Sequence, residues 1–244
     1  MRKILFIFFM LFWVAGITGL AQAGIFDDIL KKLPAANSAA PSAGPDQKTT
    51  VSGLKEALVI SSKNAVKAVS KKDGYFGNPL VKIQLPDNIQ KVADMVAKLG
   101  YQKQVDSLIL SMNRAAEAAA PKAVPLFADA IKSMSIDDAR KILQGGDTAA
   151  TQYFKDKTSA KLYGEFKPVV VAKMNKVGVA KAYKNMTATY ESLPLVSKES
   201  MDIDHYVTNE ALDGLFLIIG QEEKKIRTDP GSRVTDLLKT VFGK

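Results

Sequence analysis

The chain has 244 residues, one histidine, no cysteine and a formal net charge of +9, with 34 Lys and Arg against 25 Asp and Glu. The lack of cysteine excludes a disulfide framework, a thiol nucleophile, thiolate metal sites and lipid attachment through an N-terminal cysteine. With 47% apolar residues, the chain can bury one sizeable core or two small ones, and this core must supply its cohesion.

The first 23 residues have the three-part pattern of a secretory signal peptide. Arg2 and Lys3 precede an apolar run over residues 4–20, and residues 21–23 place small side chains where a signal peptidase reads them. We expect cleavage after Ala23 and a periplasmic mature chain; an uncleaved membrane anchor is the alternative. Loss of Arg2 and Lys3 lowers the net charge from +9 to +7. This surplus favours an anionic envelope component as partner, and the compartment disfavours nucleic acid.

A short amphipathic segment and a linker are expected next. Residues 24–33 (GIFDDILKKL) place apolar side chains on one helical face and charges on the other. Residues 34–50 are rich in Ala, Ser and Pro and predict a flexible linker. The segment can dock on the domain or lie on a membrane surface, and docking is favoured because ten residues bury little apolar area. The predicted divisions are therefore 1–23, 24–50 and 51–244.

The domain is predicted to be almost entirely helical from Ser52, its expected N-cap, onward. Asp73-Gly74 ends the first helix, and Pro86-Asp87 opens the next. Between them, residues 81–85 (VKIQL) alternate apolar and polar side chains, the only strand-like pattern in the chain. Because one strand alone has no ladder partner, we expect an extended segment that lies over helices.

Further helix boundaries are predicted in the second half of the domain. Ser135 and Asp138 form a pair that resembles a capping box, Asp147 is the expected cap of the following helix, and Pro168 starts another. Residues 201–227 are the longest predicted helix. The chain is thus expected to form a single all-α, multi-helix bundle domain of about nine helices with one short extended segment and no membrane span after cleavage.

Five stretches of the domain together resemble a known bacterial family. They are GLKEAL (53–58), KKDGYFGNPLVKIQLP (71–86), MNRAAEAAAPKA (112–123), ILQGGDTAATQYF (142–154) and ALDGLF…EEKKIRTDP…TDLLKTVFG (211–243). Over roughly residues 50–243, the chain resembles the uncharacterised family called domain of unknown function 4197. The resemblance implies one all-α domain that is typically exported, often as a lipoprotein, although this chain has no cysteine to lipidate. It implies no agreed activity and no cofactor.

The first candidate binding cluster is Asn113, Arg114 and Glu117, which lie among alanines within one turn of each other. On a helix, Asp106 falls on the same face as Asn113 and Glu117, and Arg114 is close enough to Glu117 for an ion pair. The cluster is either a recognition site for a carboxylate, phosphate or amide, or an interhelical lock. As a lock, it is expected to pair with polar groups of the C-terminal helices.

The second candidate is a pair of guanidiniums, Arg227 and Arg233, on either side of the predicted helix start at Asp229-Pro230. Free N–H groups at a helix start together with two guanidiniums can hold an anion, although Asp229 itself can fill that place as a cap. No metal site is predicted, because His205 is the only histidine and has only two nearby acids, Asp202 and Asp204. No catalytic residue is assigned.

Three functions are open to such a chain. The first is a non-catalytic envelope module that binds a protein or an envelope component. The second is a carrier for a small apolar or amphipathic ligand held between helices. The third, and least favoured, is a hydrolytic enzyme that uses Glu117 as acid or base beside Arg114, because the neighbouring Arg opposes the raised pKa that this role needs.

Overall fold

The computed structural model describes residues 46–176 and 202–243, which are almost entirely helical and contain no strand. The all-α class predicted from the sequence is confirmed. The α-helices are α2 (Gln47–Ser70), α3 (Asp87–Val96), α4 (Gln102–Ala119), α5 (Ala123–Ser133), α6 (Ile136–Gln144), α7 (Ala149–Lys176), α9 (Ile203–Thr228) and α10 (Asp236–Phe242). Short helical turns are η1 (Ala97–Tyr101), η2 (Ala120–Lys122) and η3 (Pro230–Ser232). None of the helices in these two ranges has the length and apolarity needed to cross a membrane.

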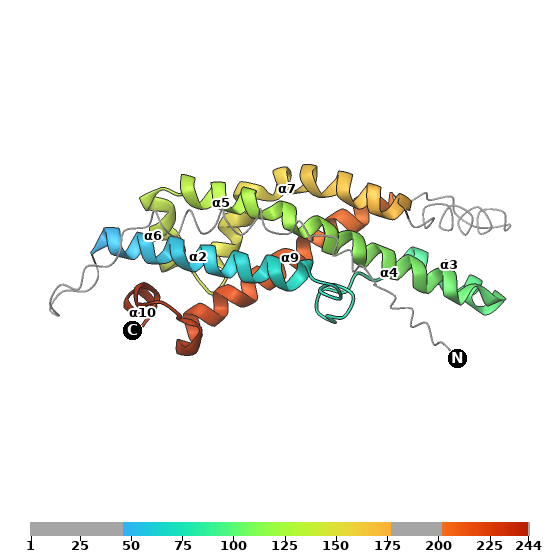
Figure 1. Ribbon diagram of the computed structural model, residues 1–244, viewed down its shortest axis with the longest axis horizontal. Coiled ribbons are helices and arrows are strands. Elements are labelled where there is room, and N and C mark those ends of the chain that lie inside the picture. The colour runs from blue at the N-terminus through green and yellow to red at the C-terminus, as the bar shows by residue number, and fades with distance from the viewer. Residues whose placement is uncertain (1–45, 177–201, 244) are drawn as a thin grey trace, which may run out of the picture.

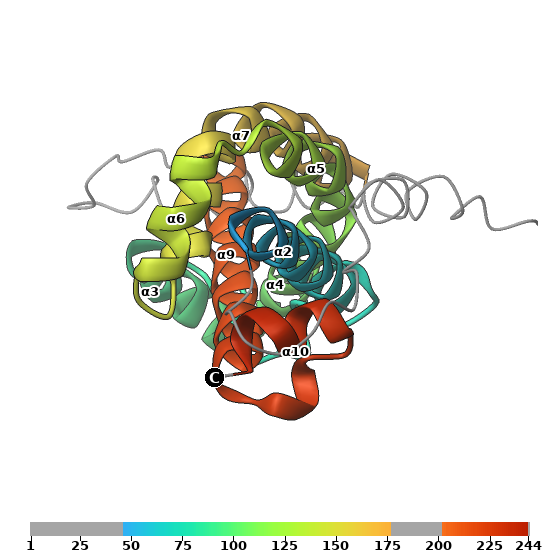
Figure 2. The same ribbon diagram turned by 90° about the vertical axis from the view of Figure 1, so that its left-hand side faces the viewer.

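Helix α2 runs through the middle of the bundle and contacts α4, α5, α6, α9 and α10 (Figures 1 and 2). Because neighbours surround it, α2 buries polar as well as apolar side chains. The buried hydroxyls of Ser61 and Ser62 both donate to the carbonyl oxygen of Leu58, one turn earlier. These bonds satisfy the hydroxyls inside an apolar core without any partner from another helix.

Helix α7 continues through Pro168, so the helix start predicted there is wrong. Its buried side chains recur every four residues along its whole length, and this stripe holds the helix together across the proline: Phe154, Thr158, Leu162, Phe166, Val170 and Met174. A proline inside a helix removes one backbone hydrogen bond and crowds the carbonyl group four residues earlier, so the packing of this stripe must outweigh that cost. At 28 residues, α7 is also longer than the 26-residue α9, which was predicted to be the longest helix.

The described residues contain fewer than the nine helices predicted for the whole domain, and one reason is that α7 absorbs the run that was expected to start at Pro168. The start of α2 also differs, because Asp46 is its N-cap and accepts a hydrogen bond from the Thr49 N–H at 2.6 Å. Ser52, the predicted cap, is buried inside α2. The first turn of α2 consists of polar residues, so no apolar periodicity in the sequence indicates that the helix begins there. The leader and residues 24–33 lie outside the described residues.

Two local predictions are confirmed. Ser135 and Asp138 form a capping box at the start of α6, with reciprocal hydrogen bonds between each side chain and the other residue's backbone N–H. Residues 82–86 are extended without belonging to a sheet, and Val81, Ile83 and Leu85 point into the core. The extended segment therefore covers the helices with its apolar face, as the alternation indicates.

Two glycines of α9 give a matched test of this packing. A Cβ atom on Gly214 would lie 2.8 Å from the buried ring of Tyr75 and 3.1 Å from Val81 Cβ, whereas on Gly220 it would lie 3.6 Å from Thr151 Oγ1. We expect Gly214→Ala to lower the free energy of unfolding by about 1–3 kcal/mol through overpacking. Gly220→Ala should raise it by up to about 1 kcal/mol through helix propensity. Urea unfolding followed by circular dichroism measures both, and equal effects would contradict this account.

Candidate functional site

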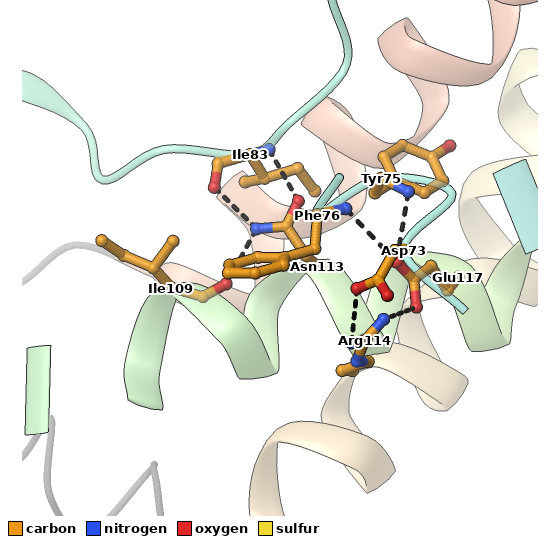
Figure 3. Close-up of polar contacts among 8 residues, drawn as sticks. All are labelled: Asp73, Tyr75, Phe76, Ile83, Ile109, Asn113, Arg114 and Glu117. Carbon is orange, nitrogen blue, oxygen red and sulfur yellow. Dashed lines mark hydrogen bonds and ion pairs between the residues drawn. The ribbon is translucent and has the colours of Figure 1, made fainter. Parts of the chain in front are cut away.

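The side chain of Asn113 takes the place of a strand partner for the extended segment (Figure 3). Its Oδ1 accepts a hydrogen bond from the N–H of Ile83 at 2.9 Å, and its Nδ2 donates to the carbonyl oxygen of Ile83 at 2.8 Å. The same Nδ2 donates to the carbonyl oxygen of Ile109, one turn earlier in α4. Because Asn113 and Ile83 are buried, these bonds satisfy backbone groups whose isolation would be costly.

One turn further along α4, Glu117 holds the loop that follows α2 (Figure 3). Its Oε1 accepts from the backbone N–H groups of Tyr75 at 3.1 Å and Phe76 at 3.2 Å. Its Oε2 accepts from Arg114 at 2.6 Å, and Arg114 also pairs with Asp73 at 2.7 Å. Glu117 is only 5% exposed, so two amide dipoles and one guanidinium compensate a buried charge.

Asn113, Arg114 and Glu117 therefore converge, and we call these three residues the α4 lock. The prediction that the lock pairs with polar groups of the C-terminal helices is wrong. The lock fastens α4 to residues 73–83 instead. Asp106 does not join the lock; it is exposed and accepts a hydrogen bond from a glutamine of its own helix. Asn113 and Glu117 are buried, whereas the Arg114 side chain is 31% exposed and closes the lock on its solvent side.

Tyr75 connects this loop to α9. Its ring is fully buried, and its hydroxyl donates a hydrogen bond to the carbonyl oxygen of Ala211. Burial, and after it the charge of Glu117, raises the pKa of the Tyr75 hydroxyl well above its ordinary value. The hydroxyl stays neutral and remains a donor, so α2, α4 and α9 are tied together at one loop.

A second buried carboxylate, Glu223 of α9, caps the start of α7. Its two oxygens accept from the N–H groups of Ala150 and Thr151, each at 2.9 Å, and from the Thr151 hydroxyl at 2.8 Å. These N–H groups belong to the first turn of α7 and have no acceptor within the helix. Arg227 pairs with the same carboxylate at 3.0 Å. Glu223, and not the predicted cap Asp147, accepts from these two groups.

Arg227 and Arg233 direct their donors to protein oxygens near the end of α9. Arg227 also donates to the carbonyl oxygen of Ile142 at 2.9 Å. Arg233 donates to the carbonyl oxygens of Ile226 at 3.0 Å and Arg227 at 2.8 Å, which would otherwise be unpaired at the helix end. Asp229 accepts from the N–H of Gly231, so the place considered for an anion holds a carboxylate of the chain.

The five predicted site residues thus belong to two networks that share no residue. One contains Asn113, Arg114 and Glu117, and the other contains Arg227 and Arg233. His205 belongs to neither network, and its ring nitrogens lie 2.7 Å from the Tyr163 hydroxyl and 3.0 Å from Asn209 Nδ2. Across residues 46–176 and 202–243, no group of three or more His, Asp or Glu side chains is placed to hold a metal ion.

An open groove of about 700 Å³ lies along α9, and we call it the α9 groove. One wall is the stretch from Leu80 to Lys82, and the other is the start of α7 from Thr148 to Lys155. The floor is the face of α9 between Glu210 and Lys224, where the glycines at 214 and 220 carry no side chain. With a rise of 1.5 Å per residue, this face is about 21 Å long.

Five charged side chains line the α9 groove: Lys82, Lys155, Glu210, Asp213 and Lys224. None of them forms a hydrogen bond or an ion pair with another residue in the described parts of the chain. The Lys82 and Lys155 ammonium groups instead lie 4.5 Å and 5.5 Å from the ring centroids of Phe76 and Phe216. Between these charges, the apolar side chains of Leu80 and Leu217 are exposed.

Glu210 has the most perturbed environment among these charges. Burial raises the pKa of its carboxyl above the ordinary value, and the neighbouring charge of Asp213 raises it further. The two carboxyls thus line the groove close enough to each other for the charge of Asp213 to act on Glu210. Such a group in a cleft is the kind of position at which proteins bind ligands.

The comparisons with known proteins identify the family. The profile of the family described as "Protein of unknown function (DUF4197)" matches residues 44–243. The chain belongs to this family. Searches among curated proteins and among solved structures found no match. The DUF4197 match runs from the start of α2 to the end of α10, so the α4 lock, the Glu223 cap and the α9 groove all lie within the family domain.

Glu223 was not among the residues singled out from the sequence, and its role becomes visible only in the structure. Its position carries a signal, however, because the buried residues Ile219 and Ile226 lie four residues before and three residues after it. That spacing puts Glu223 on the buried face of α9, where a carboxylate needs partners. The groove has no comparable signal, since its walls and floor come from parts of this DUF4197 chain that are far apart in sequence.

Replacement of Glu117 tests whether the lock stabilises the fold. Glu117→Gln keeps the size of the side chain. It removes the negative charge that compensates Arg114, and it replaces one acceptor oxygen by an NH2 group. We expect the free energy of unfolding to fall by about 2–3 kcal/mol. The matched control is Asp137→Asn, which breaks an exposed Arg–carboxylate pair of the same sequence spacing, Arg140–Asp137, and should cost under about 0.5 kcal/mol. Similar losses in both variants, measured by urea unfolding, would show that the lock contributes no more than a surface pair.

Proposed function

We propose that this protein is an exported, non-catalytic binding module of the bacterial envelope that holds a segment of a partner protein in the α9 groove. The observation that carries the proposal is the set of five charged side chains in the groove that lack ion-pair partners among the described residues. Charges of both signs around Leu80 and Leu217 suit a polypeptide that carries charged and apolar side chains together.

The length of the groove is consistent with such a ligand. A face of about 21 Å accommodates roughly six residues of extended chain at about 3.3 Å each. The acids Glu210 and Asp213 lie toward the start of this face, and Lys224 lies at its end. A bound segment would therefore be oriented, with its basic side chains near Glu210 and an acidic side chain near Lys224.

The contacts of Glu117 favour a structural role for this residue over a catalytic one. Its oxygens accept from two backbone N–H groups and one guanidinium, and its side chain is buried. A general acid or base must reach the proton that it transfers. An inward carboxylate with these partners supports a structural role, so we do not propose the hydrolytic function considered from the sequence.

The carrier function has weaker support than the binding of a protein segment in the α9 groove. A carrier between helices needs an enclosed cavity of several hundred Å³. The hollow among α2, α9 and α10, lined by Leu58, Ile226 and Phe242, measures about 10 Å³, which is room for a single water molecule. The α9 groove is large enough but open to solvent, which suits a polymer better than a small apolar molecule.

Export is proposed on the sequence of the first 23 residues. Arg2 and Lys3, the apolar run 4–20 and the small residues at 21–23 support a leader that is removed after Ala23. The surplus of basic side chains on the remaining chain suits contact with anionic components of the envelope.

The raised pKa of Glu210 predicts that this carboxyl lowers the stability of the fold in a pH-dependent way. A carboxyl whose pKa is higher in the folded than in the unfolded protein destabilises the fold as pH rises through the folded pKa, since the folded state then loses a proton that it holds tightly. Glu210→Gln should therefore leave stability unchanged below the ordinary value of 4.5 and increase it near about pH 8. The measurement is the urea midpoint of both proteins at both pH values.

The control for this experiment is Glu165→Gln, which removes an exposed carboxylate from a 3.4 Å pair with Lys122. It should change stability little at either pH. If Glu210→Gln increases stability equally at low and high pH, the folded protein does not raise the pKa of Glu210, and the account of this charge in the groove is wrong.

Photo-crosslinking tests the groove as a binding site. A photoreactive amino acid is placed at Leu217 in the groove, or at Ile136, which is similarly exposed on α6. In bacteria that express the chain with its own leader, we expect a defined adduct only from position 217. The joint substitution Glu210→Lys and Asp213→Lys should abolish the adduct, because it reverses the charge at one end of the groove. The adduct should be periplasmic, and intact mass should show that the chain begins at Gly24.

Adducts of equal yield from both positions, or an adduct that is insensitive to charge reversal, would contradict specific binding in the groove. A full-length chain retained in the cytosol would contradict export separately.

A further inference from the structure

The connection between α3 and α4 forms an exposed tip at one end of the molecule. In Figure 1, α3 and the first half of α4 both lie at the end of the molecule that extends beyond the end of α7. The principal packing partners of α3 are η1 and α4, so the hairpin is held by its own contacts. We call residues 98–103, KLGYQK, the α3–α4 tip.

The tip presents large apolar side chains to solvent. Leu99 is 71% exposed, Tyr101 is 54% exposed, and Met95, one turn before the tip, is 46% exposed. Gly100 lies between Leu99 and Tyr101 with φ of 94°, a conformation that glycine adopts without strain. The chain reverses at this glycine, and no residue of η1 is buried. The fold therefore holds these side chains away from the core.

The charges of the tip have one sign. Lys98 and Lys103 bracket the apolar pair, and the sequence 98–103 contains no acid. Neither lysine forms an ion pair with another residue of the described chain. The nearest acids in the sequence, Asp94 and Asp106, accept hydrogen bonds at 2.7 Å and 2.8 Å from glutamines of their own helices. The lysines are thus available to an external anion.

Exposed Leu and Tyr between two lysines are chemically complementary to an anionic lipid surface. A tyrosine ring suits the boundary between head groups and acyl chains, and a leucine inserts just below it. The aliphatic stems of lysine follow the apolar residues while their ammonium groups stay among the phosphates. A protein groove would more commonly pair such lysines with carboxylates in fixed positions, and nothing in the tip fixes them.

We propose that the α3–α4 tip docks into the surface of a membrane that contains anionic phospholipid, with Leu99 and Tyr101 inserted and Lys98 and Lys103 bound to head-group phosphates. The contact is peripheral and reversible, because two side chains bury little apolar area. The tip and the α9 groove share no residue, and this proposal stands whether or not the groove binds a protein.

A single tryptophan makes the docking measurable. The only tryptophan of the sequence is Trp13, in the apolar leader, so the chain from Gly24 onward contains none. Tyr101→Trp therefore places one reporter in the tip, and Val234→Trp places one at another strongly exposed position as a control. Vesicles of phosphatidylcholine with about one phosphatidylglycerol in three should shift the emission of Tyr101→Trp to the blue. Pure phosphatidylcholine should not, and Val234→Trp should not respond to either.

Flotation with the same vesicles separates the apolar and ionic contributions. Lys98→Gln with Lys103→Gln should weaken binding about 30-fold, and Leu99→Ser with Tyr101→Ser should weaken it by at least about tenfold. Lys132→Gln with Lys141→Gln lowers the net charge equally on α5 and α6, and Ile136→Ser with Val234→Ser removes two equally exposed apolar residues. Both controls should bind as the parent chain does.

Equal weakening by the tip variants and their controls would overturn the proposal, since binding would then follow net charge alone. Binding that none of the variants changes would assign the membrane contact to residues 24–33. Absence of any vesicle binding, with a dimer that Leu99→Ser and Tyr101→Ser dissociate in ultracentrifugation, would assign the tip to a second copy of the chain and equally overturn it.

Discussion

The compensation of two buried carboxylates is the constraint on which the rest of this structure depends. Removing a carboxylate from water is costly unless hydrogen bonds and an opposite charge replace its hydration. Glu117 and Glu223, each 5% exposed, meet this demand in the same way. Each accepts from two consecutive backbone N–H groups and from an arginine of its own helix, Arg114 or Arg227. Glu117 thereby fixes a loop without regular structure, whereas Glu223 fixes the first turn of a helix.

These two carboxylates also fix the two walls of the α9 groove. Glu117, with Asn113 beside it, holds residues 73–83, and the stretch from Leu80 to Lys82 is one wall. Glu223 holds the start of α7, and that start is the other wall. Since Glu223 itself belongs to α9, the floor and one wall are joined directly. The groove is therefore formed before any ligand arrives, which lowers the entropy that binding would cost.

Local patterns in the sequence predicted the features that depend on neighbouring residues, as at the Ser135–Asp138 capping box and the apolar alternation of residues 81–85. They failed where distant contacts override a local preference. A proline often marks a helix start, yet the buried stripe on both sides of Pro168 keeps α7 continuous. The α4 lock was recognised from its spacing, but its partner was not, because a loop 30–42 residues away in sequence covers α4 there. No local pattern brings together the three segments that form the groove.

The partners of charged side chains distinguish the parts of this fold that maintain it from the parts that we propose to bind other molecules. In the lock and the Glu223 cap, every charge has a partner within the chain. The groove and the α3–α4 tip keep charges without such partners among the described residues, beside exposed apolar side chains. Because these two surfaces share no residue, a lipid surface and a protein segment can be bound at the same time. Docking of the tip would then confine the groove to a thin layer above the membrane, and the effective concentration of a membrane-associated partner would rise without any additional contact.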